Sequence, residues 1–278
     1  MKKLALAAAA VSILFTGAAS AADPPTTYTK APPPQILSWA GFYAGINAGG
    51  NWGTSSESLD VTSRGGFFGP PCFPPANVCG VNVVDVRNAG LQKLNTSGFT
   101  GGGQVGYNWQ TGATVFGVEA DLNYFRGAGN GSRTVGLGLV LGVPETVTVG
   151  ESMSTDWLFT LRPRIGWAIN NNWLLYATGG LAVTNLKAGW TFRETVFGNV
   201  AAGSASGTKA GWTVGAGVET KFSGGWGLGL EYLYVRFDNI SGTVPVVLPA
   251  GGGPVAQNFT ENADLQSNIV RAKLNYHF

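Results

Sequence analysis

The chain ends with residues 269–278, IVRAKLNYHF, and this stretch decides how the rest of the sequence is interpreted. In a β-strand, alternate side chains point to opposite faces of the sheet. One face of this stretch is wholly apolar and the other is polar and partly charged. The apolar face holds Val270, Ala272, Leu274, Tyr276 and Phe278, and the polar face holds Arg271, Lys273, Asn275 and His277. The sequence therefore predicts a strand whose two faces meet different environments and whose end is aromatic.

The composition of the whole chain fits such strands better than membrane helices or a water-soluble domain. Glycine is abundant, with 43 residues, and charged residues make up only 12%, where about a quarter is usual in soluble domains. The mean hydropathy is slightly positive, yet after residue 22 no apolar run approaches the roughly 18 residues of a membrane helix. Hydrophobicity that is diluted by alternation is typical of a transmembrane β-barrel.

Residues 1–22 are predicted to be a cleaved secretory signal. Lys2 and Lys3 form a basic start, residues 4–15 an apolar core, and residues 17–22 a run of small residues, with cleavage after Ala22 or Ala21. A single membrane anchor is the alternative, but the apolar run is too short to span a bilayer. Export would place the mature chain in an oxidising compartment.

A proline-rich leader is predicted at residues 23–38, before a barrel domain at residues 39–278. The leader, DPPTTYTKAPPPQILS, contains Pro at five positions and should be extended and unable to join a sheet. A periplasmic leader is the simpler reading, and a recognition segment for another envelope component is the alternative. Removal of Lys2 and Lys3 leaves 15 basic and 15 acidic residues, so charge gives no basis for a nucleic-acid partner.

Eight stretches share the alternating pattern, and an even number of strands allows antiparallel closure. They are residues 41–53, 98–110, 114–126, 154–167, 173–186, 210–222, 226–237 and 264–278. Turns of about three residues follow the second, fourth and sixth stretches, whereas long segments (54–97, 127–153, 187–209 and 238–263) follow the others. Short periplasmic turns and long extracellular loops are typical of outer-membrane barrels. The predicted fold is thus all-β, an eight-stranded antiparallel transmembrane barrel with four long loops.

Two local details of these strands are also predicted. Pro163 falls on the apolar face of its strand and suggests a bulge or bend there, while Asp156 falls on the polar face of the same strand. In the stretch 173–186 the phase stays open, because Leu175 and Tyr176 both fit the apolar face.

The charged face is expected to point into the barrel. An eight-stranded barrel has an interior just wide enough to be filled by side chains, and buried charges are tolerated only when they are paired. Nine charged residues on this face nearly balance and predict an interior ion network: Glu119, Asp121, Glu219 and Glu231 against Arg162, Arg164, Lys221, Arg271 and Lys273. A soluble, lipocalin-like barrel with the faces reversed is the alternative, and a requirement for detergent separates the two.

Four segments resemble one family of alphaproteobacterial proteins. They are WAGFYAG at 39–45, LYATGGLA at 175–182, GAGVE at 215–219 and NYHF at 275–278. From about residue 39 to its end the chain is similar to the small immunogenic outer-membrane β-barrels of Brucella and rhizobia, described as porin-family proteins. The resemblance implies a surface-exposed antigen of the Gram-negative cell outer membrane. Its aromatic ending, with Tyr276 and Phe278, resembles the signal read by the barrel assembly machinery and implies that machinery as a partner.

The remaining chemistry-bearing residues point to structural roles. Cys72 and Cys79, in an exported loop, are predicted to form a disulfide, with free thiols as the alternative. His277, the only histidine, is expected to be hydrogen-bonded, and catalysis is the less favoured reading because no nucleophile motif accompanies it. Glycines 101–103 lie inside a strand and lack the lysine of a phosphate loop. No metal, cofactor or enzymatic activity is expected.

Three functions remain open from the sequence. The favoured one is structural, with envelope integrity and contacts through the loops, in a setting of outer-membrane lipid and lipopolysaccharide. A narrow passive channel past Arg162, Arg164 and Glu119 is the second. A receptor or adhesin that binds haem or a host ligand through the loops is the third.

Overall fold

The computed structural model describes residues 38–63, 83–140, 143–169, 172–196, 198–222, 224–247 and 254–278. Within them the chain forms eight strands and one short helix. No helix in these residues is long and apolar enough to span a membrane. The elements are β1 (Gly41–Ser63), α1 (Val83–Ala89), β2 (Gln92–Thr111), β3 (Thr114–Val140), β4 (Val143–Ala168), β5 (Trp173–Glu194), β6 (Val200–Lys221), β7 (Trp226–Val247) and β8 (Pro254–His277).

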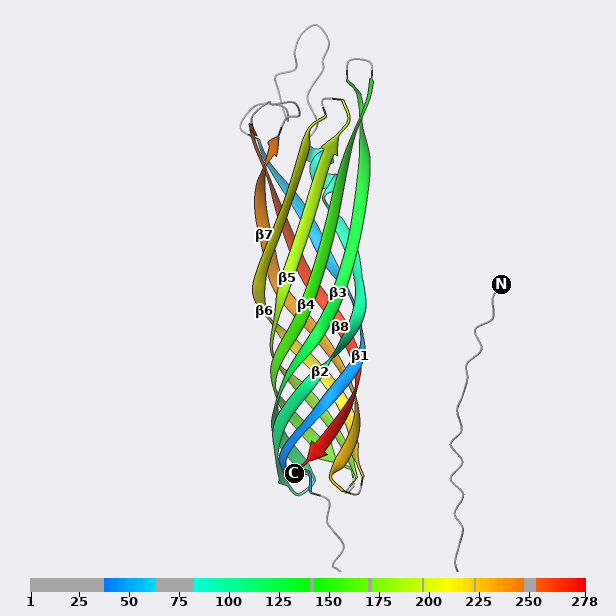
Figure 1. Cartoon of the computed structure of the whole chain (residues 1–278), viewed down its shortest axis with the longest axis vertical. Coiled ribbons are helices and arrows are strands. Elements are labelled where there is room, and N and C mark those ends of the chain that lie inside the picture. The colour runs from blue at the N-terminus through cyan, green and yellow to red at the C-terminus, as the bar shows by residue number, and fades with distance from the viewer. Residues whose placement is uncertain are drawn as a thin grey trace, which may run out of the picture. The chain divides into compact units, whose positions relative to one another are not determined.

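The strands form one closed antiparallel barrel, which confirms the predicted fold. Neighbours in the chain are neighbours in the sheet, and β8 pairs with β1 to close it, so the blue and red ribbons lie side by side in Figure 1. The closing ladder runs from Tyr43 opposite His277 to Ser63 opposite Gln257. Closure leaves the sheet without the free edges at which strands associate with other chains.

The strands are longer than the sequence pattern indicated. A membrane-spanning strand needs about 9–11 residues, whereas the strands here have 20 to 27. The additional residues lie at the end opposite the short turns, and they occupy most of the segments expected to be long loops. In these additional residues the pattern of the predicted strands is reversed. Their outward side chains are small or polar, for example Ser56 and Asn95, while apolar residues such as Val147 point inward.

The short helix α1 was not predicted either. Val86 and Ala89 are fully buried and pack with Leu59 and Phe259, while Arg87 donates a hydrogen bond to Asp60 on β1 at 2.6 Å. A helix of this length has too few residues to show a clear helical period in the sequence.

The outer wall carries an apolar belt at the turn end of the barrel. Leu122 is 60% exposed and Trp167 58% exposed, a state that water would make costly for so many apolar side chains but that lipid tolerates. Aromatic residues lie at the two borders of the belt. The far border has Trp52, Phe99, Tyr124, Trp157, Trp212 and Tyr234, and the turn-end border has Trp109, Trp167, Trp173, Trp226, Tyr276 and Phe278.

The structure decides the strand phases that the sequence left open or misplaced. Leu175 points outward and Tyr176 inward. Asp156 does not face the interior as expected, because the register shifts between Thr155 and Leu158 and turns it outward, where it pairs with Lys187. The bulge on β4 is therefore there and not at Pro163, which stays in register opposite Val118.

One part of the wall is only partly paired. Within the described residues, β6 and β7 form a continuous ladder up to Gly211 opposite Phe237, and then pair again only at Val200 and Val247. In Figure 1 the two ribbons diverge in this region. On the inner side of this incomplete ladder, Ile240 of β7 packs in an apolar cluster that also contains Trp190 of β5.

Two glycines inside the barrel make room for buried tyrosines. A Cβ added at Gly106 would overlap the Tyr43 ring, and one added at Gly217 would lie 2.5 Å from the Tyr176 ring. Each tyrosine therefore lies flat over a glycine of a neighbouring strand, which only an absent side chain permits.

Substitution Gly106→Ala should destabilise the barrel by about 1–3 kcal/mol, because the added methyl displaces Tyr43 in a packed interior. Urea unfolding of the protein in phospholipid vesicles, followed by tryptophan fluorescence, measures the effect. Gly103→Ala on the lipid-facing side of β2 is the matched control, since its Cβ meets its nearest atom, the Gly45 carbonyl oxygen, at 3.6 Å. Equal stability of the two variants would contradict the packing described here.

Candidate functional site: the barrel interior

The interior is built in layers, which can be followed along β8. From the turn end, its inward residues are polar or charged up to Arg271 and then mainly apolar from Ile269 to Ala263, with Ser267 as the one polar residue. Beyond them come the acidic Glu261 and the aromatic Phe259. Strands on the other side supply matching layers, since side chains at one level of a narrow barrel meet across its axis.

The charged layer is a buried network of ion pairs. Arg162 Nη2 lies 2.6 Å from Glu119 Oε1 and 2.8 Å from Asp121 Oδ2. Arg271 Nη2 lies 2.9 Å from the same Asp121 oxygen and 2.6 Å from Glu231 Oε2. These five side chains come from β3, β4, β7 and β8, so the network connects strands that are not neighbours in the sheet.

Lys273, Arg164 and Glu219 extend this network towards the turns. Lys273 Nζ lies 2.6 Å from Glu119 Oε2. Arg164 Nη1 lies 3.6 Å from both Glu119 Oε2 and Glu219 Oε2. His277 Nε2 is 2.9 Å from Glu219 Oε1. Apart from the histidine, four carboxylates thus meet four basic side chains, so the layer is formally neutral.

Lys221 is placed elsewhere than the other eight predicted network residues. Among the described residues it forms no ion pair; its Nζ donates a hydrogen bond to the Ser38 carbonyl at 2.6 Å and lies 4.7 Å from the centre of the Trp39 ring. Trp39 is fully buried, and Asn108 Nδ2 donates to its carbonyl at 3.1 Å. Trp39, two residues before β1, therefore closes the turn end of the barrel, a role that the sequence did not reveal.

Uncharged side chains complete the charged layer. The hydroxyls of Tyr43 and Tyr176 donate to Glu119 Oε2 and Glu231 Oε1 at 2.7 and 2.9 Å. Thr160 Oγ1 donates to Asp121 Oδ2 at 2.7 Å. The sequence placed Tyr43 on the polar face but did not assign it a partner, because pairing across the barrel cannot be read from one strand.

Above the charged layer the interior is filled by apolar side chains. The cluster contains Leu94, Phe125, Met153, Leu158, Ala182, Leu186, Ala188, Trp190, Leu233, Val235, Phe237, Ile240, Ala263, Leu265 and Ile269. A second apolar cluster with Leu59, Val149, Phe192 and Phe259 lies farther from the turns and includes residues of α1. Ions that crossed the barrel would have to displace both clusters.

Buried carboxyls lie between the two apolar clusters. Glu57, Glu151 and Glu261 point inward from β1, β4 and β8, each less than 5% exposed. Ser55 Oγ donates to Glu57 Oε1 at 2.6 Å, but no lysine or arginine of the described chain pairs with any of the three. Burial raises the pKa of Glu57 to about 7 and that of Glu261 to about 7. The pKa of Glu151 is also raised, by burial and by neighbouring Glu261.

These acidic residues were missed because they lie in segments expected to be loops. The signal is present, since Glu57 and Glu261 fall on the same parity as the inward residues of their strands. It becomes visible only once the strands are known to continue beyond the apolar belt.

Other predicted sites lie partly outside the described residues. Cys72 and Cys79, the signal and residues 23–37 of the leader are among these, so the disulfide and the cleavage remain predictions. At the C-terminus, Phe278 is 73% exposed and packs against Phe42 and Tyr276. In the described part of the chain, no group of three His, Cys, Asp or Glu side chains is arranged to hold a metal ion.

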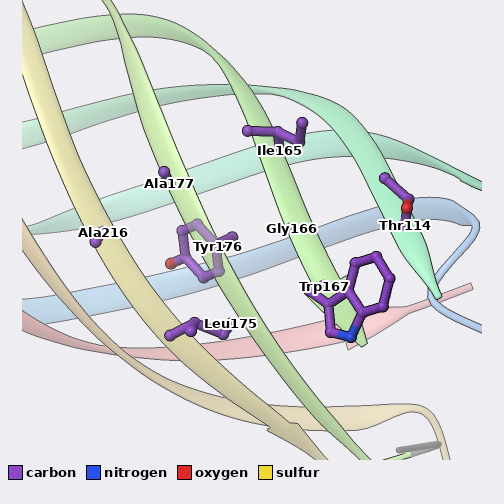
Figure 2. Close-up of a pocket in the computed structure, with 8 residues that line it drawn as sticks. All are labelled: Thr114, Ile165, Gly166, Trp167, Leu175, Tyr176, Ala177 and Ala216. Atoms are coloured by element: carbon purple, nitrogen blue, oxygen red, sulfur yellow. The ribbon is translucent and has the colours of Figure 1, made fainter. Parts of the chain in front are cut away.

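Two of the grooves on the outer wall differ in character. Figure 2 shows an apolar one near the turns, where Ile165, Trp167 and Leu175 stand around the small Ala177 and Ala216. Its volume is about 560 Å³, and its apolar lining suits lipid chains. The second groove, of about 530 Å³, lies at the far border of the belt and is lined mainly by amide, hydroxyl and aromatic side chains.

Comparison with known proteins agrees with this geometry. A family model described as outer membrane protein beta-barrel domain matches residues 6–278. The chain is 33% identical over 239 residues to the 31 kDa outer-membrane immunogenic protein of Brucella melitensis, which covers 84% of this chain and 86% of that protein. It is also 33% identical over 147 residues to the 22 kDa outer membrane protein of Rhizobium leguminosarum, which covers 52% of this chain and 56% of that protein.

Solved structures show more distant similarity. The outer membrane protease OmpT of Escherichia coli has 8% identity and a TM-score of 0.41, with 86% of this chain and 97% of that chain covered. Ail, the attachment invasion locus protein of Yersinia pestis, has 14% identity and a TM-score of 0.27, with 83% of this chain and 99% of the Ail chain covered. Neither similarity is high enough to transfer an activity.

Substitution Arg162→Met should lower the free energy of unfolding by about 3–5 kcal/mol, because it leaves four buried carboxylates with three basic side chains, and so one buried negative charge is uncompensated. The measurement is urea unfolding in vesicles. Arg193→Met, which removes an exposed arginine of β5, is the control and should change stability by less than about 0.5 kcal/mol. A barrel that tolerates both changes equally does not depend on the ion network.

The carboxyls between the apolar clusters should make stability fall as pH rises. Because the pKa values of Glu57 and Glu261 are higher in the folded protein, the unfolded chain releases these protons at a lower pH than the folded protein does. The contribution of the two groups to the free energy of unfolding is therefore fully present below about pH 4.5 and is lost as the pH rises to about 7. The double substitution Glu57→Gln with Glu261→Gln should flatten the decline. Unfolding midpoints at several pH values measure it, with Asp238→Asn on the exposed side of β7 as control. An unchanged slope in the double variant would contradict this assignment.

Proposed function

Because the chain belongs to the outer membrane protein beta-barrel domain family, we propose that it is a structural, surface-exposed protein of the cell outer membrane. In this role it supports envelope integrity and presents the far part of the barrel for contacts outside the cell. Signal cleavage, a periplasmic leader and recognition of Tyr276 and Phe278 by the barrel assembly machinery are parts of the same proposal.

The filled interior is the observation that carries this proposal. An eight-stranded barrel that conducts needs a continuous path for water and ions, but here charged side chains pair across the axis and apolar clusters lie above them. A layer that holds strands together from inside suits a mechanical role better than transport. This observation disfavours the narrow channel.

The long strands support a role at the cell surface. About half of most strands, though less of β2, continues beyond the aromatic border at Trp52 and Tyr234, with mainly polar residues outside and apolar residues inside. This part would stand clear of the lipid as a folded platform. The Brucella relative is named an outer-membrane immunogenic protein, and surface exposure of this chain would be consistent with that name.

A non-enzymatic role fits the surroundings of the single histidine. His277 contacts Glu219 and lies against Trp39 and Tyr43 at the turn end. In the described chain no serine, threonine or cysteine lies within hydrogen-bond distance of it, so a nucleophile and base pair is not assembled there.

Conductance across planar bilayers tests the proposal against the channel. The purified protein should produce no current steps above those of the detergent alone. Steps that disappear when Arg162 and Arg164 are replaced by Ala would assign the barrel a channel function and overturn the structural one.

Experiments in cells test the structural role itself. A strain without the protein should become more sensitive to detergent with a chelator, and the wild-type gene should restore resistance. A Gly106→Ala variant should restore it less well, in proportion to the folded protein seen by heat-shifted gel migration. Cells that lose the protein without any change in sensitivity would contradict a role in envelope integrity.

A further inference from the structure

The groove of about 530 Å³ at the far border of the apolar belt combines polar and aromatic side chains in a way that a purely structural role does not require. It crosses β2, β1, β8 and β7 at the far border of the apolar belt. Its lining includes Trp52, Thr54, Asn95, Tyr234, Gln266 and Asn268. On the turn side of the groove the next outward residue is apolar, for example Val270, two residues from Asn268 on β8. On the far side the next outward residue is polar or charged, for example Ser56, two residues from Thr54 on β1. A ligand in this groove would therefore lie at the boundary between lipid chains and water.

The polar side chains of the groove are held in fixed orientations. Tyr234 Oη donates to Gln266 Oε1 at 2.8 Å, and Gln266 Nε2 donates to Thr54 Oγ1 at 3.0 Å. Two residues nearer the turns on β8, Asn268 Oδ1 accepts a hydrogen bond from the Tyr232 hydroxyl, and Asn268 Nδ2 donates one to the Trp52 carbonyl oxygen. These bonds set the direction of each amide, which reduces the entropy lost when a ligand binds.

Free hydrogen-bonding capacity remains in the groove. Each amide has a second N–H, and among the described residues the Asn95 side chain has no hydrogen-bond partner. Trp52 is half exposed, so its ring offers a flat apolar face beside these groups. Neutral amides and hydroxyls around an aromatic face match the hydroxyls and apolar C–H face of a sugar ring.

Basic residues stand on both sides of the groove. Arg236 lies directly opposite Gln266 in the β7–β8 ladder. On β2, Lys93 is the next outward-facing residue beyond Asn95 in the direction away from the turns. Both are exposed, and neither forms an ion pair in the described chain, unlike exposed Lys187 and Arg87. Asp264, whose carboxylate accepts the Ser56 N–H at 2.8 Å, lies farther from the lipid and would direct an anionic ligand group towards Arg236.

From these features we infer that the groove binds the phosphorylated sugar headgroup of a glycolipid in the outer leaflet. The acyl chains would lie along the apolar belt below Trp52, the sugar would contact the amides, and phosphate would meet Arg236 and Lys93. A phospholipid headgroup lacks the sugar ring that the amides and Trp52 match, so the site should distinguish the two lipid classes.

Native mass spectrometry of the folded protein in nonionic detergent tests this inference, with lipid A and phosphatidylglycerol as the probes. The double substitution Trp52→Leu with Arg236→Ala should weaken lipid A binding at least tenfold and leave phosphatidylglycerol binding unchanged. The matched control, Trp167→Leu with Arg193→Ala, removes an exposed tryptophan and an exposed arginine elsewhere on the wall and should bind lipid A normally. Heat-shifted gel migration checks that both variants are folded.

Three results would overturn the inference. Equal loss of both lipids would mean a general attraction for anionic lipid, and equal lipid A binding by all variants would mean that the groove is not the site. Efficient cross-linking of Thr54→Cys between two copies in cells would mean that the groove is an interface between barrels. None of these results depends on the structural role, which the conductance and detergent-sensitivity experiments test separately.

Discussion

The barrel depends on the pairing of charges in a space too narrow to hydrate them. Eight strands enclose an interior that side chains fill, and in its charged layer four carboxylates lie among four basic groups. Because Glu119 contacts Arg162, Arg164 and Lys273, the removal of this one carboxylate would weaken the pairing of three basic groups and leave the layer with an unbalanced buried charge. Such a network favours the strand arrangement seen here, because it brings carboxylates of β3 and β7 within pairing distance of basic groups of β4 and β8.

Above this layer the same wall encloses a different kind of core. The far half of the barrel has apolar residues inside and polar residues outside, as a water-soluble protein would, whereas the turn end has the opposite arrangement. The two halves share continuous strands, so β8 changes from Arg271 to Leu265 on one face without interruption. The change of environment at the lipid border is therefore encoded in side chains alone and not in the backbone.

Much of this could be predicted from alternation, and the failures have local causes. The inward phase of Arg271 and Lys273 follows from parity, and closure follows from an even number of strands. Asp156 was misplaced because one register shift reverses parity, which no periodic pattern reveals. Lys221 was grouped with the network because parity gives the face but not the level in the barrel. Glu151 and the far strand segments were not predicted, because a strand with an apolar outward face exists only where the wall meets lipid.

The incomplete ladder between β6 and β7 has a consequence for how the barrel moves. Between Gly211 and Val200 the two strands are held by side-chain packing, chiefly at Ile240, instead of a row of backbone bonds. Thermal breathing of the wall should begin there, and backbone amides along this stretch of β6 should exchange their hydrogens with water sooner than those of β8. The wall is then not uniformly rigid, because a continuous ladder joins β8 to β1 while the nearby junction of β6 and β7 is free to open.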